Sequence, residues 1–129
     1  MNTLSHLRHE ASTAWAANRW RSAFTGIAVI SNRRTIPHLD RLGSKSWYDI
    51  LFGSGSYDQA RLILSEIGLS LEYSTGTAVA LCGNCLRHEV REWGDGDRIC
   101  YAMFMRHEVL KRYGSHYVGW STSDTYLGK

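Results

Sequence analysis

Several features that define whole classes of protein are scarce in this chain of 129 residues. Its three cysteines are an odd number, which does not suit the disulfide framework of a small secreted domain. The longest stretch without a charged residue, Tyr73–Leu86, is shorter than the ~18 apolar residues that a membrane helix needs. The opening segment MNTLSHLRHEAS lacks the apolar run of a secretory signal. We therefore expect an intracellular protein that does not enter a membrane.

Charge of one sign is also weak. Fifteen Lys and Arg residues face twelve Asp and Glu residues, a net charge of +3, which permits a nucleic-acid partner without requiring one. There is no internal repeat and no low-complexity segment. With 43% hydrophobic and 21% charged residues, the composition is that of an ordinary globular protein. The length suits one hydrophobic core, so we expect a single domain over residues 1–129 that acts as a monomer.

The first part of the chain predicts a helix. Between residues 4 and 20, apolar side chains recur at steps of three and four, which places them on one helix face. These side chains are Leu4, Leu7, Ala11, Ala14 and Trp15. We expect residues 1–24 to form a helical N-terminal segment that packs on the outer face of a sheet formed by residues 25–120.

After residue 24 the chain breaks into short β-rich runs that Gly, Ser, Asn and Asp separate. The predicted strands cover residues 25–31, 46–53, 61–65, 69–74, 77–82, 85–90 and 98–105. Seven short strands with polar turns predict a mainly β fold, which is a sandwich, a barrel or a jelly roll. Residues 106–114 predict a short closing helix that ends at Gly114.

The stretch VALCGNCLRHEV offers two cysteines and a histidine, which could form a zinc site. As two strands joined by the turn Gly83-Asn84, however, the segment would form a hairpin in which Cys82 and Cys85 face each other. Alternation along the second strand then turns His88 to the opposite face from Cys85. A structural zinc site also needs four ligands. We therefore favour two small apolar residues at a hairpin over a zinc-binding interaction domain.

A different set of ligands fits His88 better. His38 and Asp40 stand two residues apart, so an extended segment presents both side chains on one face. His88 follows Asp40 after a stretch of predicted strands. Two imidazoles and one carboxylate form the facial triad that binds Fe(II) and leaves positions open for an organic co-substrate and O₂. We therefore expect these three residues to be metal ligands at a catalytic centre.

The last predicted strand adds a basic residue for an acidic co-substrate. Alternation places Arg98, Cys100, Ala102, Phe104 and Arg106 on one face of it. The opposite face is apolar and suits a docked helix. Arg98 can hold a carboxylate through two parallel hydrogen bonds. We expect the first face to line a pocket with an arginine at each end, although Arg98 also fits a solvated turn and Arg106 the start of a helix.

These pieces together resemble the Tet/JBP-type branch of the Fe(II)/2-oxoglutarate dioxygenases, and in particular its short fungal members. The resemblance runs from about Ala28 to Trp120. It is carried by the stretches AVISNRRTIPHLD, SWYDIL, GTAVALCGNCLRHEV and GDRICYAMFMRHEV. It implies a double-stranded β-helix, which is a cupin-like jelly roll, and it implies Fe(II) and 2-oxoglutarate as cofactors.

The resemblance also implies roles for single residues. His38, Asp40 and His88 match the iron ligands, and Arg98 matches the residue that binds the distal carboxylate of 2-oxoglutarate. Cys100 falls where a small polar residue assists that arginine, and Arg106 falls where relatives touch the target base. By the same analogy, 2-oxoglutarate and O₂ are used to hydroxylate a methyl group on a flipped base, most often 5-methylcytosine in DNA. That activity implies methylated DNA as partner, and a nuclear location.

The chain departs from its relatives at the base-binding positions. Leu39 stands where they usually have Arg, and Gly43 where they usually have an Asn that holds the base. The segment FGSGSYDQA also replaces their more typical GDYxGG, and the part before the β core is short. We therefore expect modest discrimination between bases. The alternatives are the same chemistry on N6-methyladenine, RNA or protein, and an inactive jelly-roll module that only binds.

Overall fold

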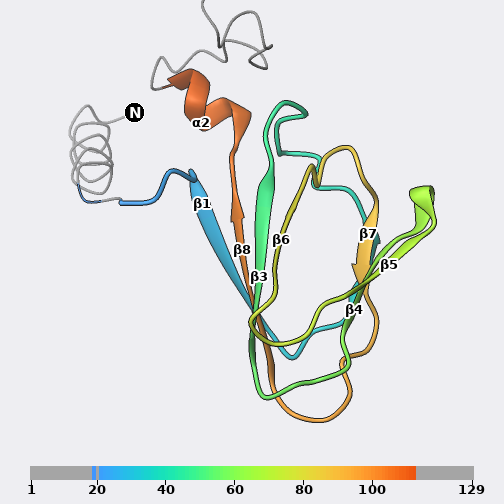
Figure 1. Cartoon of the computed structure of the whole chain (residues 1–129). Coiled ribbons are helices and arrows are strands. Elements are labelled where there is room, and N and C mark those ends of the chain that lie inside the picture. Colours follow the sequence, from blue (N-terminus) through green and yellow to red (C-terminus); the bar gives the residue numbers. More distant parts are fainter. Residues whose placement is uncertain (1–18, 20, 113–129) are drawn as a thin grey trace, which may run out of the picture.

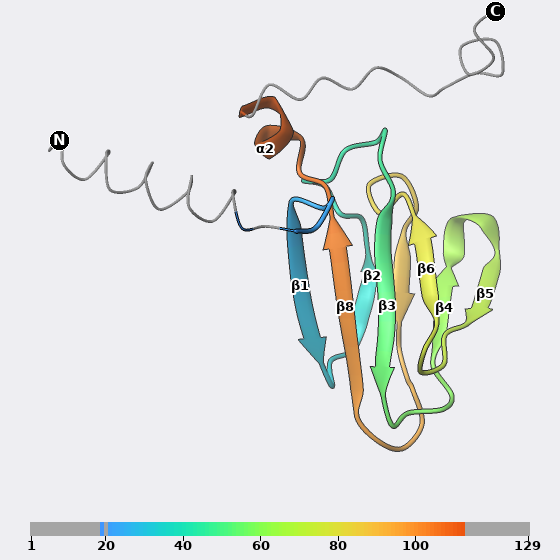
Figure 2. The same ribbon diagram turned by 60° about the vertical axis from the view of Figure 1, so that its left-hand side comes forward.

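The computed structural model describes residue 19 and residues 21–112, which form two four-stranded antiparallel sheets packed face to face (Figures 1 and 2). One sheet has the order β1-β8-β3-β6 and the other the order β2-β7-β4-β5. The strands of the first sheet are Gly26–Ser31 (β1), Arg98–Phe104 (β8), Asp49–Gly55 (β3) and Ala78–Leu81 (β6). Those of the second are Thr35–His38 (β2), His88–Val90 (β7), Arg61–Leu64 (β4) and Leu69–Glu72 (β5). The mainly β prediction is confirmed, and the two sheets are those of a double-stranded β-helix.

Two short helices complete the described part of the chain. A 3₁₀ turn, Ser65–Ile67 (η1), joins β4 to β5 and ends at Gly68 in the left-handed region, with φ of 65°. The helix α2 (His107–Arg112) follows β8, as predicted. Among the described residues, no helix is long and apolar enough to span a membrane.

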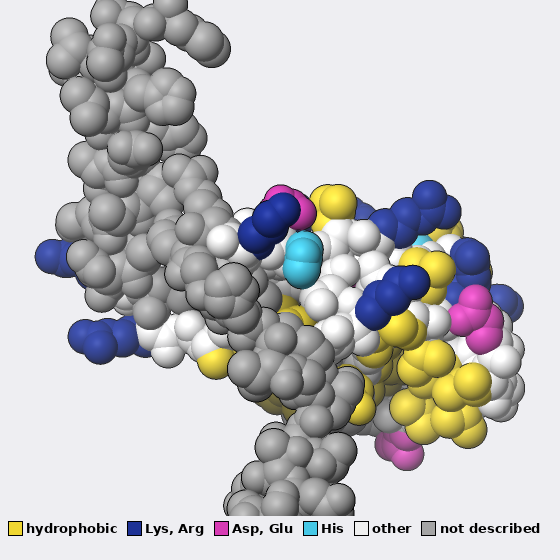
Figure 3. Space-filling view, turned by 90° about the horizontal axis from the view of Figure 1, so that it is seen from above, with side chains coloured by type: hydrophobic (Ala, Val, Ile, Leu, Met, Phe, Trp, Pro, Cys, Tyr) yellow, Lys and Arg dark blue, Asp and Glu magenta, His cyan; other side chains and the backbone are white. Residues whose placement is uncertain are grey.

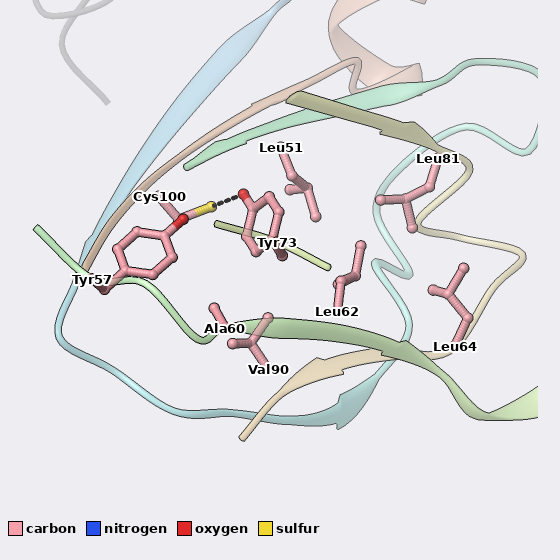
Figure 4. Packing of buried hydrophobic residues seen from close by; sticks show 9 residues of the cluster. All are labelled: Leu51, Tyr57, Ala60, Leu62, Leu64, Tyr73, Leu81, Val90 and Cys100. Atoms are coloured by element: carbon pink, nitrogen blue, oxygen red, sulfur yellow. Dashed lines mark hydrogen bonds between the residues drawn. The ribbon is translucent and has the colours of Figure 1, made fainter. Parts of the chain in front are cut away.

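The hydrophobic core lies between the two sheets (Figure 4). Strand alternation explains its composition, since every second side chain of β3 and β4 points inward. The buried members are Leu51, Tyr57, Ala60, Leu62, Leu64, Tyr73, Leu81, Val90 and Cys100. The same inward face of β3 carries Asp49, which is 5% exposed, beside Leu51. A carboxylate therefore enters the interior at the start of this strand.

The outer face of the first sheet is apolar and partly exposed. Val29 of β1, Tyr101 of β8 and Phe52 of β3 lie in register across the three strands. Their exposed fractions are 63%, 37% and 36%. This is the face on which the predicted N-terminal helix was expected to pack, but that helix falls outside the described residues.

Two local predictions were wrong. Residues 35–38 form the strand β2, although the sequence pattern did not place one there, because the pairing partner of β2 is β7, about fifty residues away in the chain. The expected hairpin around Gly83-Asn84 does not form either. Strand β6 pairs with β3 in one sheet and β7 pairs with β2 and β4 in the other. Residues 82–86 form a turn between the sheets, because each strand finds a longer-range partner.

Candidate functional site

The pairing of β2 with β7 brings the two predicted histidine ligands together. His38 ends β2, His88 begins β7, and the two are register partners. Their ring centroids are 4.3 Å apart. Asp40 follows β2 and turns its carboxylate toward both rings, with Oδ1 3.5 Å from Nε2 of His38 and Oδ2 3.6 Å from Nε2 of His88. An extended HxD segment beside a paired strand thus places three donor groups at one point.

Backbone carbonyls orient both imidazoles. Nδ1 of His38 lies 2.9 Å from the carbonyl oxygen of Ile36, and Nδ1 of His88 lies 2.9 Å from that of Leu86. A carbonyl oxygen only accepts, so each Nδ1 carries the proton and donates it. In a neutral ring the lone pair is then on Nε2, the atom that faces Asp40. This arrangement fixes the tautomer that a metal ligand needs.

The donor set fits a divalent transition metal. One ligand atom from each of His38, Asp40 and His88 lies within 4.8 Å of the others, and no other such group of His, Cys, Asp or Glu side chains occurs among the described residues. Two neutral imidazoles and one carboxylate suit Fe(II). The zinc interpretation of Cys82 and Cys85 gains no support, since His88 faces Asp40 instead.

The turn of residues 82–86 braces the loop that carries Asp40. The backbone N–H of Asp40 donates to the carbonyl oxygen of Gly83 at 2.8 Å. The side-chain amide of Asn84 donates to the carbonyl oxygens of Asp40 at 3.1 Å and Gly43 at 3.0 Å. A β-carbon at Gly83 would lie within 2.7 Å of carboxylate oxygens of both Asp40 and Asp49, so a side chain there would displace these two carboxylates. The turn and the loop therefore form one unit.

A cavity of about 380 Å³ runs between the sheets from this point. Its wall includes all three donor residues and the inward face of β8, with Arg98, Cys100, Ala102, Phe104 and Arg106. The residues predicted to share a pocket face on β8 and just beyond its end therefore line one cavity. The cavity also reaches Gly43 and Asp49. All the site residues expected from the sequence thus line one space.

Arg98 lies at the closed end of the cavity. It is 2% exposed, and its Nε has no hydrogen-bond partner. Its Nη1 makes one long contact, 3.4 Å, with the carbonyl oxygen of Arg33, and its guanidinium stands over the rings of Tyr73 and Trp93 at 5.6 and 6.0 Å. No carboxylate pairs with it in the described part of the chain. A buried cation without a partner is costly, so this arrangement favours an anionic ligand.

Two tyrosines that the sequence analysis missed stand near Arg98. Figure 4 shows Tyr57 and Tyr73 pointing toward Cys100. The hydroxyl of Tyr73 lies 3.5 Å from the sulfur of Cys100, and burial followed by this hydrogen bond raises the Tyr73 pKa. The buried hydroxyl of Tyr57 has no partner and occupies the space that a side chain at Gly53 would fill. Burial raises the pKa of Tyr57 although Arg98 opposes the shift, so both hydroxyls stay protonated donors.

Asp49 is a third residue that the sequence analysis missed. Burial, followed by the charge of Asp40, raises its pKa, while hydrogen bonds from the backbone N–H groups of Gly83 and Met105 lower it. No ion pair involves Asp49 among the described residues. The sequence contained a signal that could have identified Asp49. Strand alternation places its carboxylate on the inward face of a strand, and such a group rarely points into a core without a partner.

Gly43 and Arg106 meet at the open end of the cavity. They form an isolated antiparallel β-bridge, and a β-carbon at Gly43 would lie 3.1 Å from the carbonyl oxygen of Asp40 and 3.8 Å from a carboxylate oxygen of Asp49. Arg106 is exposed, and its guanidinium lies 5.1 Å from the centroid of the Phe104 ring. Figure 3 looks down on the end where β8 runs into α2, and Lys and Arg side chains stand at several places around its described part.

Comparisons with known proteins agree with this geometry. The model of the Tet/JBP family, described as the oxygenase domain of the 2OGFeDO superfamily, matches residues 6–107. Among solved structures, NgTET1 in complex with 5mC DNA matches with a TM-score of 0.59 and 20% sequence identity, over 72% of this chain. The match spans 43% of the length of that structure, and at this identity it shows the fold alone. The search of curated proteins found no match.

Proposed function

The chain belongs to the Tet/JBP family of 2-oxoglutarate- and Fe(II)-dependent dioxygenase domains, and from this premise we propose that it oxidises the methyl group of a methylated nucleobase, most readily 5-methylcytosine in DNA. One observation carries the proposal: a two-histidine, one-carboxylate donor set and a buried, unpaired arginine line the same cavity. The first group suits the metal and the second an anionic co-substrate.

In this proposal, His38, Asp40 and His88 hold Fe(II), which when bound activates O₂ against 2-oxoglutarate and then against the methyl group. The backbone contacts of the two Nδ1 atoms keep both rings in the binding tautomer. The turn at Gly83 and Asn84 keeps the Asp40 carboxylate in place through its backbone. The protein thereby provides a rigid set of ligands on one side of the ion.

Arg98 would bind the distal carboxylate of 2-oxoglutarate. Its unpartnered Nε and its Nη groups offer the fork that a carboxylate fills with two parallel bonds. The free hydroxyl of Tyr57 and the Tyr73–Cys100 pair supply further donors around the same end. Since β8 carries Arg98 at its start and Arg106 beyond its end, the co-substrate and the target base would occupy opposite ends of one wall.

Asp49 would read the base. An ionised carboxylate accepts a hydrogen bond from the exocyclic amine of cytosine, whereas it repels the O4 acceptor of thymine. Gly43 has no side chain, and a β-carbon there would lie 3.1 Å from the carbonyl oxygen of Asp40 and 3.8 Å from a carboxylate oxygen of Asp49. N6-methyladenine also carries an exocyclic N–H, so it is the second candidate substrate for the same contact.

Exposed arginines around the cavity would contact the nucleic-acid backbone. Arg33, Arg41 and Arg106 line the cavity and are exposed. Guanidinium groups at the rim suit phosphates on either side of a flipped base. Binding through such contacts weakens steeply with salt.

The test is a turnover assay on purified protein with Fe(II), 2-oxoglutarate and O₂. Duplex oligonucleotides carry 5-methylcytosine, N6-methyladenine or no modification, and succinate and the oxidised base are measured together. We expect succinate release that the 5-methylcytosine duplex stimulates, with one oxidised base for each succinate. Succinate release that no nucleic acid stimulates would leave a dioxygenase with another substrate. Absence of both metal and 2-oxoglutarate binding would leave the inactive binding module.

A further inference from the structure

The turn that follows β6 carries two cysteines, Cys82 and Cys85, at its first and fourth positions. The backbone N–H groups of Cys85 and Leu86 both donate to the carbonyl oxygen of Cys82 at 3.0 Å. A turn closed in this way keeps the Cα atoms of its first and fourth residues within ~7 Å, which overlaps the range that a disulfide spans. Both cysteines are free in this structure.

The two thiols differ in exposure. Cys85 is exposed and Cys82 is half-buried. Because its side chain is exposed, Cys85 is the more accessible nucleophile, and burial raises the pKa of the Cys82 thiol. The third cysteine, Cys100, is buried beside Tyr73 in the core. An exposed thiol with a second thiol next to it is the arrangement that redox-sensitive cysteines share.

The reduced form of this turn makes contacts that a disulfide cannot make. The Cys82 thiol lies 3.6 Å from the carbonyl oxygen of Lys45 and 4.0 Å from that of Ser44, and it donates to this loop. A disulfide has no S–H, and its sulfur atoms must close to ~2.05 Å. Oxidation would therefore remove the thiol from the 44–45 backbone.

The same turn holds the loop of the proposed metal ligand Asp40. Gly83, between the two cysteines, accepts the Asp40 N–H, and Asn84 donates to the carbonyl oxygens of Asp40 and Gly43. Three hydrogen bonds and two contacts of the Cys82 thiol therefore connect residues 82–85 to the 40–45 loop. Nothing in the catalytic proposal uses either sulfur.

We propose that Cys82 and Cys85 form a reversible disulfide, and that its formation loosens the 40–45 loop and weakens metal binding at the neighbouring triad. The co-reactant is a small disulfide such as oxidised glutathione. The Cys85 thiolate attacks one of its sulfur atoms and releases one glutathione, and the Cys82 thiolate then attacks Cys85 Sγ and releases the second. The pair loses two electrons to the glutathione disulfide, and the two thiol protons end on the two reduced glutathiones.

The experiment compares reduced and oxidised full-length protein. After treatment with oxidised glutathione, the intact mass should fall by two hydrogen atoms, and a peptide map should join Cys82 to Cys85. Hydrogen exchange should then accelerate at the amide of Asp40, whereas peptides from β8 should keep their exchange rates. Dithiothreitol should reverse both changes. This part needs no metal, so it is independent of the proposed function.

The effect on metal binding rests on the proposed function and is measured separately. We expect the dissociation constant of Mn(II), a probe for Fe(II), to rise several-fold on oxidation of the wild type. Cys85→Ser should bind Mn(II) like the reduced wild type, with or without oxidised glutathione. If the disulfide does not form, or forms without faster exchange at Asp40, the inference is wrong. If Mn(II) binds neither form, the proposed metal site fails while the exchange result still decides the inference.

Discussion

The metal-ligand triad and Arg98 both line the cavity, but they differ in exposure and in charge compensation. At the triad end, the Asp40 side chain is 42% exposed and that of His38 35%, and the three groups are ordered by the backbone and by one another. At the Arg98 end, a guanidinium is buried among aromatic rings without a counter-charge. The donor atoms of the triad already lie close to one another, whereas no ion pair involves Arg98 among the described residues. The triad is therefore partly exposed to solvent, whereas the Arg98 guanidinium is enclosed.

The largest expected effect comes from a substitution in the metal-ligand triad alone. In His88→Ala, one of the three metal ligands is lost, and we expect Mn(II) or Fe(II) affinity to fall by more than the ~10–100-fold that the loss of a supporting contact costs. Calorimetry with Mn(II) measures it. The matched control is His107→Ala, an exposed histidine in α2 that does not line the cavity. Full metal occupancy in His88→Ala would remove this residue from the ligand set.

The next prediction concerns a substitution that removes the Arg98 guanidinium and leaves the triad intact. Arg98→Ala removes a charge-assisted fork worth ~1.5–3 kcal/mol, so we expect 2-oxoglutarate affinity to fall by roughly ten- to a hundredfold. Mn(II) binding without 2-oxoglutarate should be retained. Arg87→Ala is the control, since Arg87 pairs with Glu66 and lies outside the cavity wall. Unchanged 2-oxoglutarate affinity would mean that the co-substrate carboxylate binds elsewhere.

A third change tests the open end of the cavity, which includes Gly43 and Asp49 and where the base is proposed to bind. Asp49→Asn offers an amide donor where the wild type offers an acceptor. We expect the ratio of turnover on 5-methylcytosine to turnover on thymine to fall by about ten- to a hundredfold, from the ~1–3 kcal/mol that a base contact discriminates. A purely structural role for Asp49 would lower both rates together. If the variant does not fold, wild-type turnover on a 5-methylpyrimidin-2-one duplex, which lacks the amine, decides the same question.

A smaller expected effect tests whether the side chains around Arg98 bind an anionic ligand. In Tyr57→Phe, the unpartnered hydroxyl is lost, so the free energy of unfolding without ligand should stay equal or rise. The affinity for 2-oxoglutarate should fall several-fold, as expected for one hydrogen bond of ~0.5–1.5 kcal/mol. Thermal unfolding with and without 2-oxoglutarate measures both. Lower stability with unchanged affinity would show that the hydroxyl serves the fold instead.

The smallest effect concerns the exposed rim. Arg106→Ala should weaken binding of duplex DNA similarly for all sequences and should reduce the slope of log affinity against log salt by ~1. Fluorescence anisotropy at several salt concentrations gives the slope. An identical slope in the variant and the wild type would exclude a phosphate contact by Arg106, and leave its ring contact with Phe104 as its role.

The sequence predicted much of this molecule because several of its signals are local. Alternation every second residue located most of the strands, and it placed Arg98 and Arg106 on one face of β8, because that period is a property of the extended backbone. The spacing of His38 and Asp40 predicted a shared face for the same reason. The family resemblance is confirmed by the profile match over residues 6–107, and the ligand roles of single residues stay predictions.

Tertiary structure decided which strands pair and which groups are left without partners. No local signal showed that β2 pairs with β7, or that β6 and β7 belong to different sheets, because pairing depends on which distant segment is available. The isolation of Arg98 and the burial of Asp49 arise only when segments far apart in the chain enclose them. The composition and hydrophobic period of a segment follow from its own sequence. Desolvation of a side chain, and the contact of the Cys82–Cys85 turn with the Asp40 loop, arise only when distant segments pack together.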